Sequence, residues 1–311
     1  MDVYSKELHK PIKRKFERRK VVSNGLNNIF GCDLVDMTKL NDGEYKYILT
    51  VIDIFSKYAW AIPLKNKTGS NVLNAFKSII DKSKRKPLKI WVDSGSEFYN
   101  QTFLKYLDDN NIGIYSVYNE GHNPVIERFN RTLKTEMWRR FTEEQNEKWA
   151  RMLPDLLELY NNKIHSSIKM TPAEASKKKN EPELLELEQN NKTIKKQKPK
   201  YKVGDKVRIS KLKKHFEKGY LPNWTVEIFT ISKILNTNPI TYKIKDYEEN
   251  EIKGSFYTEE LQKSKMEDVY LIEKVIKKKK NKIFVKWLGF DEKYNSWINE
   301  NELYNLESMK Q

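Results

Sequence analysis

Residues 33–69 read DLVDMTKLNDGEYKYILTVIDIFSKYAWAIPLKNKTG and contain most of a repeating apolar pattern. Three apolar segments, 29–37, 45–55 and 58–64, are separated by short connections. This pattern predicts three strands, and the short connections favour antiparallel neighbours. The start of the chain's folded core is therefore expected to be a β-meander.

Helical and strand-like patterns alternate after this meander. Residues 88–92 (LKIWV) form a short, nearly continuous apolar run of the kind found in buried parallel strands. Helices are expected at 71–83, 102–110, 124–141 and 149–160, and a last strand at 112–117. Because Pro154 lies inside the last helical pattern, that helix should start late or kink. The prediction is one mixed five-stranded α/β sheet with helices on its faces.

The composition points to a basic protein with a polyanionic partner. The 311 residues include 59 Lys and Arg and 43 Asp and Glu, which gives a formal net charge of +16. Such a charge favours nucleic acid as the partner. A single cysteine, Cys32, excludes a disulfide framework and a cysteine-based zinc finger. With no apolar run of about 18 residues, we expect no membrane span and no membrane partner.

Composition also divides the chain into five parts. Residues 1–24 are basic and lack an apolar period, which predicts an N-terminal arm, and 25–176 hold the mixed α/β domain. Charge runs without aromatic residues at 177–200 predict a linker, either extended or partly helical. Short β-like runs with turn residues at 201–263 predict a small β-barrel. Residues 267–310 predict a further small β-sheet domain that ends in a helix near 299–306.

Three acidic residues stand at positions that suit catalysis. Asp33 lies in the first strand, Asp93 follows the fourth, and Glu127 lies in the first turns of the helix at 124–141. Ligands of open α/β sheets collect at strand ends, and carboxylates gathered there repel one another and bind divalent cations. Two such ions, about 3.5–4 Å apart, can hold both the attacking and the leaving oxygen of a phosphoryl displacement.

The helix at 124–141 has two distinct stripes. The apolar stripe consists of Ile126, Phe129, Leu133 and Met137. Glu127, Arg131 and Lys134 form a second stripe, so that a metal carboxylate would share a face with two cations for phosphate. The alternative is an ordinary solvated Glu–Arg pair on a helix surface.

Taken together, these segments resemble a known catalytic core. Residues 33–69, DSGSEF at 93–98, VIERFNRTLKTEMWRRF at 125–141 and YNNKIHSSIKMTP at 160–172 resemble retroviral-type integrases. The closest resemblance is to the integrases of Maverick/Polinton DNA transposons and related virophages. It implies a ribonuclease H-like fold.

The resemblance also assigns functional residues. It implies that Asp33, Asp93 and Glu127 are the catalytic triad and hold Mg²⁺ or Mn²⁺, two ions per site. On the helix that carries Glu127, it implies DNA contacts from Arg131, Lys134, Arg128 and Asn130. The spacing from Asp93 to Glu127 is shorter than in retroviral members, and no zinc module precedes the core.

Other polar residues of the core are expected to be structural. Asp36 should point to the face opposite Asp33, and Asp53 should order the connection after the second strand. Cys32 is expected in the core, and Glu97 near the rim of the site. His165 is expected to pack or to cap a turn.

The barrel region has its own resemblance. YKVGDKVRI (201–209), GYLPNWTVEIFTISKI (219–234), PITYKIKD (239–246) and GSFYTEELQK (254–263) resemble an SH3-like barrel that follows the core in many integrases. Lys206, Arg208 and Lys211 are its candidate contacts with the DNA backbone. A solvated lysine face is the alternative.

The last segment, EDVYLIEKVIKKKKNKIFVKWLGFDEKYNSWINENEL at 267–303, resembles a chromodomain. The resemblance implies that Tyr270, Trp287 and Phe290 form a methyl-lysine cage, which would bind a methylated ammonium through cation–π attraction. The partner would be a methylated histone tail. The alternative is that the three rings are simply core, and Trp297 is expected to be buried.

The expected function is DNA integration. The resemblance implies an enzyme that processes the 3′ ends of mobile-element or viral DNA and joins them to target DNA by two-metal-ion transesterification. It also implies a homo-oligomer, a dimer or tetramer, in the nucleus of a eukaryotic host or packaged in a virion, with the chromodomain guiding it to modified chromatin. Two alternatives stay open: a simple metal-dependent nuclease, and an inactive integrase-derived protein that binds chromatin.

Overall fold

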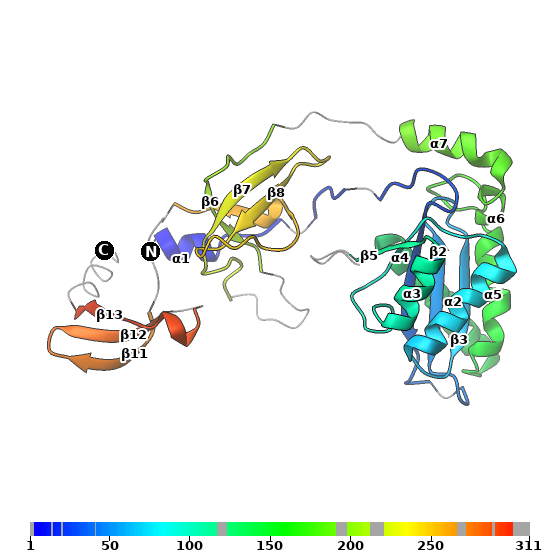
Figure 1. The fold of residues 1–311 in the computed structure, drawn as a ribbon, viewed down its shortest axis with the longest axis horizontal. Helices are drawn as coiled ribbons and strands as arrows, with labels where there is room; N and C mark the ends of the chain where they lie inside the picture. The colour runs from blue at the N-terminus through cyan, green and yellow to red at the C-terminus, as the bar shows by residue number, and fades with distance from the viewer. Residues whose placement is uncertain are drawn as a thin grey trace. The chain divides into compact units, whose positions relative to one another are not determined.

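The computed structural model describes residues 3–13, 15–19, 21–40, 42–116, 123–190, 198–211, 221–265, 272–287 and 290–300 (Figure 1). The chain forms two compact units. The first, here called the α/β unit, comprises Lys20–Thr193. The second, here called the barrel unit, comprises Met1–Arg19 together with Ile194–Gln311.

A mixed five-stranded sheet forms the centre of the α/β unit, as predicted. Its order is β3-β2-β1-β4-β5. The first three strands pair antiparallel, whereas β4 and β5 run parallel to β1. The strands are β1 (Ile29–Asp36), β2 (Tyr47–Asp53), β3 (Ala59–Leu64), β4 (Lys89–Trp91) and β5 (Gly113–Tyr115).

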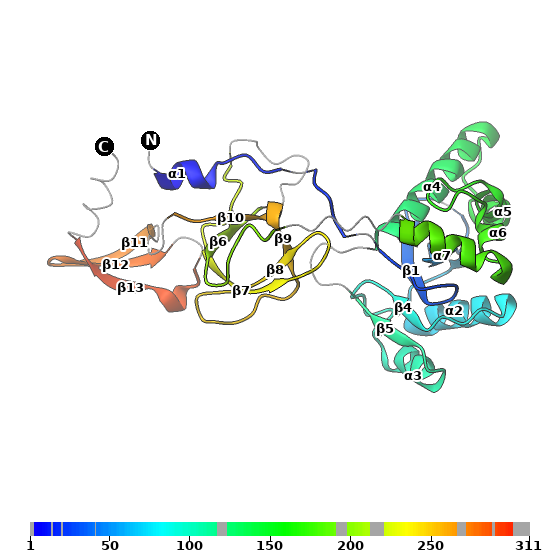
Figure 2. The same cartoon turned by 90° about the horizontal axis from the view of Figure 1, so that it is seen from above.

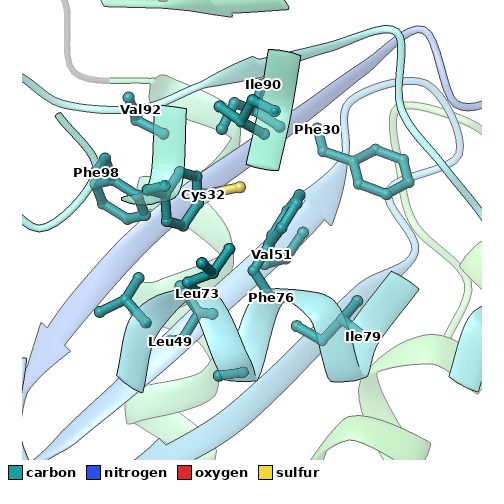
Figure 3. Packing of buried hydrophobic residues seen from close by; sticks show 14 of the residues in the cluster. Phe30, Cys32, Leu49, Val51, Leu73, Phe76, Ile79, Ile90, Val92 and Phe98 are labelled. Atoms are coloured by element: carbon teal, nitrogen blue, oxygen red, sulfur yellow. The ribbon is translucent and has the colours of Figure 1, made fainter. Parts of the chain in front are cut away.

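Helices cover both faces of this sheet (Figure 2). On one face, α2 (Gly69–Ser83) and α3 (Gln101–Asp109) bury apolar side chains against Phe30 and Cys32 of β1, as Figure 3 shows for α2. On the other face lie α4 (Pro124–Glu144) and α5 (Leu153–Asn162).

The two faces of β1 differ because successive side chains of a strand point to opposite sides. Phe30 and Cys32 belong to the core on the α2 side, and Val35 belongs to the core on the α4 side. Asp33 and Gly31 therefore share the α4 face with Val35.

Pro154 delays the helix that contains it. A 3₁₀ turn at Ala150–Met152 comes first, and α5 begins at Leu153. Proline is tolerated in the first helical turn because its missing N–H would have no partner inside the helix there. The late start is thus the alternative that the structure confirms.

The segment expected to be a linker is partly helical. After α6 (Pro172–Ala175) and a 3₁₀ turn at Lys178–Asn180, α7 spans Glu181–Asn190. Leu184 of α7 is buried in a small cluster of the α/β unit. The Glu181 carboxylate also accepts a hydrogen bond from Leu26 N (2.9 Å), so α7 packs on this unit.

The barrel unit contains a second five-stranded sheet, which is antiparallel throughout and has the order β10-β6-β7-β8-β9. Val207, Ile231 and Tyr242 are fully buried in its core. Its strands are β6 (Lys206–Ile209), β7 (Phe229–Leu235), β8 (Thr241–Lys245), β9 (Phe256–Tyr257) and β10 (Leu261–Lys263).

The N-terminal segment is built into this unit, although we expected a basic arm. Helix α1 spans Val3–Leu8. The Leu8 carbonyl accepts hydrogen bonds from the backbone N–H groups of Asn223 and Trp224, and Leu8 packs against the Trp224 ring.

A three-stranded sheet completes the described part of the barrel unit, in the order β11-β12-β13. It consists of β11 (Ile272–Lys279), β12 (Lys282–Trp287) and β13 (Ser296–Asn299), with a 3₁₀ turn at Glu292–Tyr294. The helix expected near 299–306 lies, from residue 301 on, outside the described residues.

The expectation that Trp297 is buried is wrong, because its side chain is 46% exposed. Ile283 and Val285 of β12 bury one face of the small sheet. Trp297 pairs in register with Phe284, which alternates to the opposite face, and the two rings lie 5.3 Å apart. Among the described helices of both units, none is long and apolar enough to cross a membrane.

Candidate active site

Asp33 lies in β1, and Asp93 follows the neighbouring parallel strand β4 by two residues. The β1–β4 register pairs Gly31 with Trp91. If that register continued for two residues beyond the end of β4, Asp33 would lie opposite Asp93. Val92, between Trp91 and Asp93, is buried in the core on the α2 side, so alternation places Asp93 on the α4 face together with Asp33.

Asn130 of α4 reaches across to Asp33. Asn130 Nδ2 donates to Asp33 Oδ2 at 2.7 Å, and Leu34 N donates to Asp33 Oδ1 at 2.8 Å. Asn130, which we predicted to contact DNA, is only 8% exposed, and its amide binds the carboxylate. Its geometry instead fixes the orientation of Asp33.

The start of α4 is held close to β1 by a glycine. Asn123 caps the helix by accepting hydrogen bonds from Val125 N and Ile126 N. A Cβ atom on Gly31 would lie 2.5 Å from Asn123 Nδ2, so only glycine leaves room for this cap. Glu127 follows in the first turn, exposed, and shares a helix edge with Asn130 at i, i+3.

The loop after β4 presents Asp93 to solvent. Asp93 is exposed, and its Oδ1 accepts a hydrogen bond from Gly95 N at 3.2 Å. The Glu97 carboxyl group lies over Gly95, where a Cβ atom would come within 2.5 Å of it. Asp93 and Glu97 thus both contact Gly95, and the position of Glu97 near the rim stays a prediction.

The carboxylates of Asp33, Asp93 and Glu127 suit a hard divalent cation, but in the described residues they are not close enough together to hold one. Among the residues that the structure describes, no three Asp, Glu, His or Cys side chains are grouped so that they could hold a metal ion. Residues 117–122, which precede α4, lie outside the described residues. Carboxylate oxygens are the ligands that Mg²⁺ prefers, and a hydrogen-bonded carboxylate such as Asp33 is typical of a metal ligand.

Basic side chains accompany the acids on α4. Arg128 and Arg131 are exposed, and Lys134 is half-buried. Hydrogen bonds from Thr38 hold the pKa of Asp36 below its ordinary value, with a smaller contribution from Lys134. All three cations thus lie on the helix that carries Glu127.

The two rival acids have partners of their own. Asp53 is fully buried, accepts hydrogen bonds from Phe55 N (3.2 Å) and Ser56 Oγ (2.7 Å), and forms an ion pair with Arg85. This confirms that it orders the connection after β2. Asp36 accepts hydrogen bonds from the Thr38 backbone and side chain. Cys32 is buried as expected, and burial raises the pKa of its thiol.

The barrel residues expected to contact DNA have different surroundings. Lys211 is exposed, whereas the half-buried Lys206 donates from Nζ to Thr230 Oγ1 at 2.9 Å. The prediction for Arg208 is wrong, because its side chain is fully buried and forms an ion pair with Glu7 at 3.3 Å. Its Nη1 also donates to the backbone carbonyls of Thr225 and Val226, so the guanidinium is bound within the barrel unit.

Two of the three expected cage residues share a cavity. Trp287 and Phe290 line a cavity of about 260 Å³ together with Tyr247 and Tyr294. Tyr270 lies outside the described residues. Tyr294, four residues after Phe290, could have been found from its position in the sequence, whereas Tyr247 belongs to a distant segment and gave no signal.

Comparison with known proteins agrees with the fold of the α/β unit. Residues 27–116 match the integrase core domain family. A transposon-derived protein of Caenorhabditis elegans is 30% identical over 191 residues, 61% of this chain and 64% of that protein. The Gag-Pol polyprotein of avian reticuloendotheliosis virus is 29% identical over 127 residues, 40% of this chain and 11% of the polyprotein.

A solved structure extends the likeness to most of the chain. One chain of the simian T-cell lymphotropic virus intasome, solved in complex with a regulatory subunit of PP2A, superposes with a TM-score of 0.57. It is 17% identical, and the match covers 82% of this chain and 83% of that chain. The present chain spans less than two thirds of the nematode and viral proteins above. Its α/β unit is similar to the integrase core domain and to segments of retroviral and transposon-derived proteins.

Proposed function

We propose that this protein is a DNA integrase, a metal-dependent polynucleotidyl transferase that processes the 3′ ends of mobile-element or viral DNA and joins them to target DNA. The observation that carries the proposal is the parallel pairing of β1, which contains Asp33, with β4, which ends two residues before Asp93. Helix α4, which bears Glu127, is fixed to Asp33 through Asn130. The match of residues 27–116 to an integrase core supports it.

Asp33, Asp93 and Glu127 would hold Mg²⁺ or Mn²⁺, two ions in each site. When bound, the ions supply charge that activates the attacking oxygen and stabilises the leaving oxygen. The chain's own contribution is orientation, because Asn130 and Leu34 N fix both oxygens of Asp33. Arg131 and Lys134 would neutralise the phosphates of the DNA end.

The chemistry balances without an external energy source. In processing, a water oxygen attacks a phosphodiester near the DNA end, and the 3′ oxygen leaves with a proton. In joining, that 3′ hydroxyl attacks a target phosphodiester, and the displaced target oxygen takes up a proton. One phosphodiester forms for each one broken in joining, so ATP is not required.

The barrel unit would supply the remaining partners. We place DNA-backbone contacts on Lys206 and Lys211 of an SH3-like barrel, and a methylated histone tail on a chromodomain that includes Trp287 and Phe290. Two DNA ends must be held together during integration, which requires a dimer or tetramer. We further propose that the protein belongs to a Maverick/Polinton-type transposon or a related virophage and acts in the nucleus of a eukaryotic host.

A strand-joining assay tests the proposal. Purified protein is incubated with Mn²⁺ or Mg²⁺, labelled duplexes bearing the element's ends, and supercoiled target DNA. Joined products should form with the wild type and be lost in Asp33→Asn, Asp93→Asn and Glu127→Gln. Asp36→Asn, on the same strand as Asp33 and bonded to Thr38, is the matched control and should stay active.

Two results would overturn the proposal. Cleavage without joining would identify a metal-dependent nuclease. A wild type that binds DNA but neither cuts nor joins would identify an inactive, chromatin-binding descendant of an integrase. Calorimetric titration with Mn²⁺ gives a second readout of the triad, since each of the three variants should bind the ion more weakly than Asp36→Asn does.

A further inference from the structure

Four aromatic side chains surround the cavity at the end of β12. Trp287, Phe290, Tyr247 and Tyr294 line its volume of about 260 Å³. The Tyr247 ring stands at a steep angle to Phe290 (centroids 5.6 Å apart, 66° between planes) and to Tyr294 (5.3 Å, 86°). Phe290 and Tyr294 are themselves 6.1 Å apart at 80°. These three rings therefore pack edge to face, and all of them line the cavity.

Hydrogen bonds hold the walls in place. Trp287 Nε1 donates to Ser296 Oγ of β13 at 2.9 Å, which satisfies the indole N–H outside the cavity. Both tyrosine hydroxyls donate to the same Glu248 oxygen, Oε1, with Tyr247 at 3.0 Å and Tyr294 at 2.5 Å. One carboxylate thus clamps two walls of the box, and these hydrogen bonds hold the pKa of Glu248 below its ordinary value.

This combination selects a particular ligand chemistry. Aromatic faces attract cations, most strongly cations that shed water easily, such as alkylated ammonium groups. The Glu248 carboxylate adds negative charge beside the box and repels anions. Lys293 shows that the surroundings accept an ammonium, since its Nζ lies 4.6 Å from the Tyr294 ring centroid and 3.7 Å from Glu248.

Tyr247 and Glu248 come from a segment far from the other walls. They follow β8 of the five-stranded sheet, whereas Trp287 ends β12 of the three-stranded sheet, and Phe290 and Tyr294 lie between β12 and β13. The Tyr294–Glu248 hydrogen bond joins residues 46 positions apart. The box is therefore complete only when the two sheets are in contact.

We propose that Tyr247 and Tyr294, clamped by Glu248, complete with Trp287 and Phe290 a binding box for the alkylated ammonium of a methylated lysine side chain, and that Tyr247 makes this binding depend on the five-stranded sheet. The inference rests on the proposed function only in taking Trp287 and Phe290 as walls for methyl-lysine. Its new content is the contribution of Tyr247, Tyr294 and Glu248.

Saturation-transfer NMR on the full chain tests the inference, with acetyl-trimethyl-lysine amide as the probe. Transfer to its N-methyl protons should be seen with the wild type and should be competed by tetramethylammonium. With acetyl-lysine amide, no transfer to the ε-methylene protons should be seen. Tyr247→Ala should weaken binding about fivefold to tenfold, the scale of one cation–π contact. Tyr247→Phe, which keeps the ring and loses the bond to Glu248, should weaken it less.

The controls separate the possible failures. Trp287→Ala removes a wall that both proposals require and should abolish the signal, whereas Tyr99→Ala, an exposed tyrosine of the α/β unit, should leave it unchanged. If the wild type does not bind the probe, the methyl-lysine assignment itself is wrong. If Trp287→Ala abolishes binding while Tyr247→Ala binds as the wild type does, only the inference about the five-stranded sheet is wrong.

Discussion

Asn130 Nδ2 donates a hydrogen bond of 2.7 Å to Asp33 Oδ2, across 97 positions of sequence. The bond joins helix α4 to strand β1, and α4 also carries Glu127 one turn earlier. A change at Asn130 would therefore affect both the orientation of one acid and the placement of another. This makes Asn130 a positioning residue for the proposed site.

Asn130→Ala should lower strand joining by about 10–100-fold, the usual effect of removing a group that orients a metal ligand. DNA affinity should stay close to that of the wild type, because the side chain is buried. Added Mn²⁺ should restore part of the activity if orientation of Asp33 is what was lost. Thr135→Ala is the control, since the Thr135 hydroxyl donates a hydrogen bond to the Arg131 carbonyl of the same helix. If Asn130→Ala instead weakens DNA binding and leaves metal affinity normal, Asn130 contacts DNA, as the sequence predicts.

Gly31→Ala should displace the start of α4. The new Cβ would lie 2.5 Å from Asn123 Nδ2 and 3.3 Å from Ile54 Cδ1, so the helix cap must move. Such overpacking costs about 1–3 kcal/mol, measurable as a lower denaturation midpoint in urea. Strand joining should fall further than the loss of stability alone explains, because Glu127 moves with the helix.

Gly43→Ala provides a comparison. A Cβ atom on Gly43 would meet nothing within 4 Å, although the φ of +60° at Gly43 adds strain. Normal joining by Gly31→Ala would show that this contact does not position Glu127.

Periodicity predicted the elements of the α/β unit because each of them buries one regular face. The stripe of Ile126, Phe129, Leu133 and Met137 is buried as expected, and β1 alternates so that Cys32 and Asp33 face opposite sides. The same patterns predicted Asp33 inside the first strand, Asp93 just after the fourth and Glu127 in the first turn of a helix, as the structure has them.

Burial of polar residues was not predictable in the same way, because it depends on distant partners. Arg208 looks like a surface cation in its strand, but its partner Glu7 lies 201 positions away. Asn130 looks like a polar helix residue until Asp33 is placed beside it. Tyr247 likewise becomes a wall of the box only through contact with another sheet, which no local pattern records.

Protonation of His165 should destabilise the fold in mildly acidic solution. Burial lowers the pKa of His165 below its ordinary value of 6.5, and the nearby charges of Lys57 and Arg128 lower it further. The unfolded chain therefore binds this proton more tightly, and stability should fall as the pH drops through about 6.5 towards the lower folded pKa. Below both pKa values the contribution should be constant.

Urea denaturation at several pH values between 7.5 and 5 measures this effect. The wild type should lose more stability across that window than His165→Gln, in which the titrating group is gone while other acids and bases still contribute. Ser167→Ala is a useful comparison, since it removes the hydroxyl that contacts His165 Nδ1 (3.0 Å) and keeps the imidazole. Identical pH profiles for wild type and His165→Gln would contradict the assignment.

Glu7→Ala should destabilise the barrel unit, because it leaves the buried Arg208 guanidinium without its carboxylate. Loss of one partner of a buried ion pair costs about 3–5 kcal/mol. Glu7 also accepts a hydrogen bond from Lys265 N at 2.7 Å, which adds to the loss. Hydrogen–deuterium exchange of the full chain should show faster exchange in β6 and β10, with little change in the α/β unit.

Lys13→Ala is the matched control from the same N-terminal segment. The Lys13–Glu259 ion pair spans 3.9 Å and the Lys13 side chain is 68% exposed, so the loss of stability should stay within about 1 kcal/mol. Unchanged exchange in Glu7→Ala would mean that the N-terminal segment does not stabilise the barrel and is free to act as the basic arm that its composition predicts.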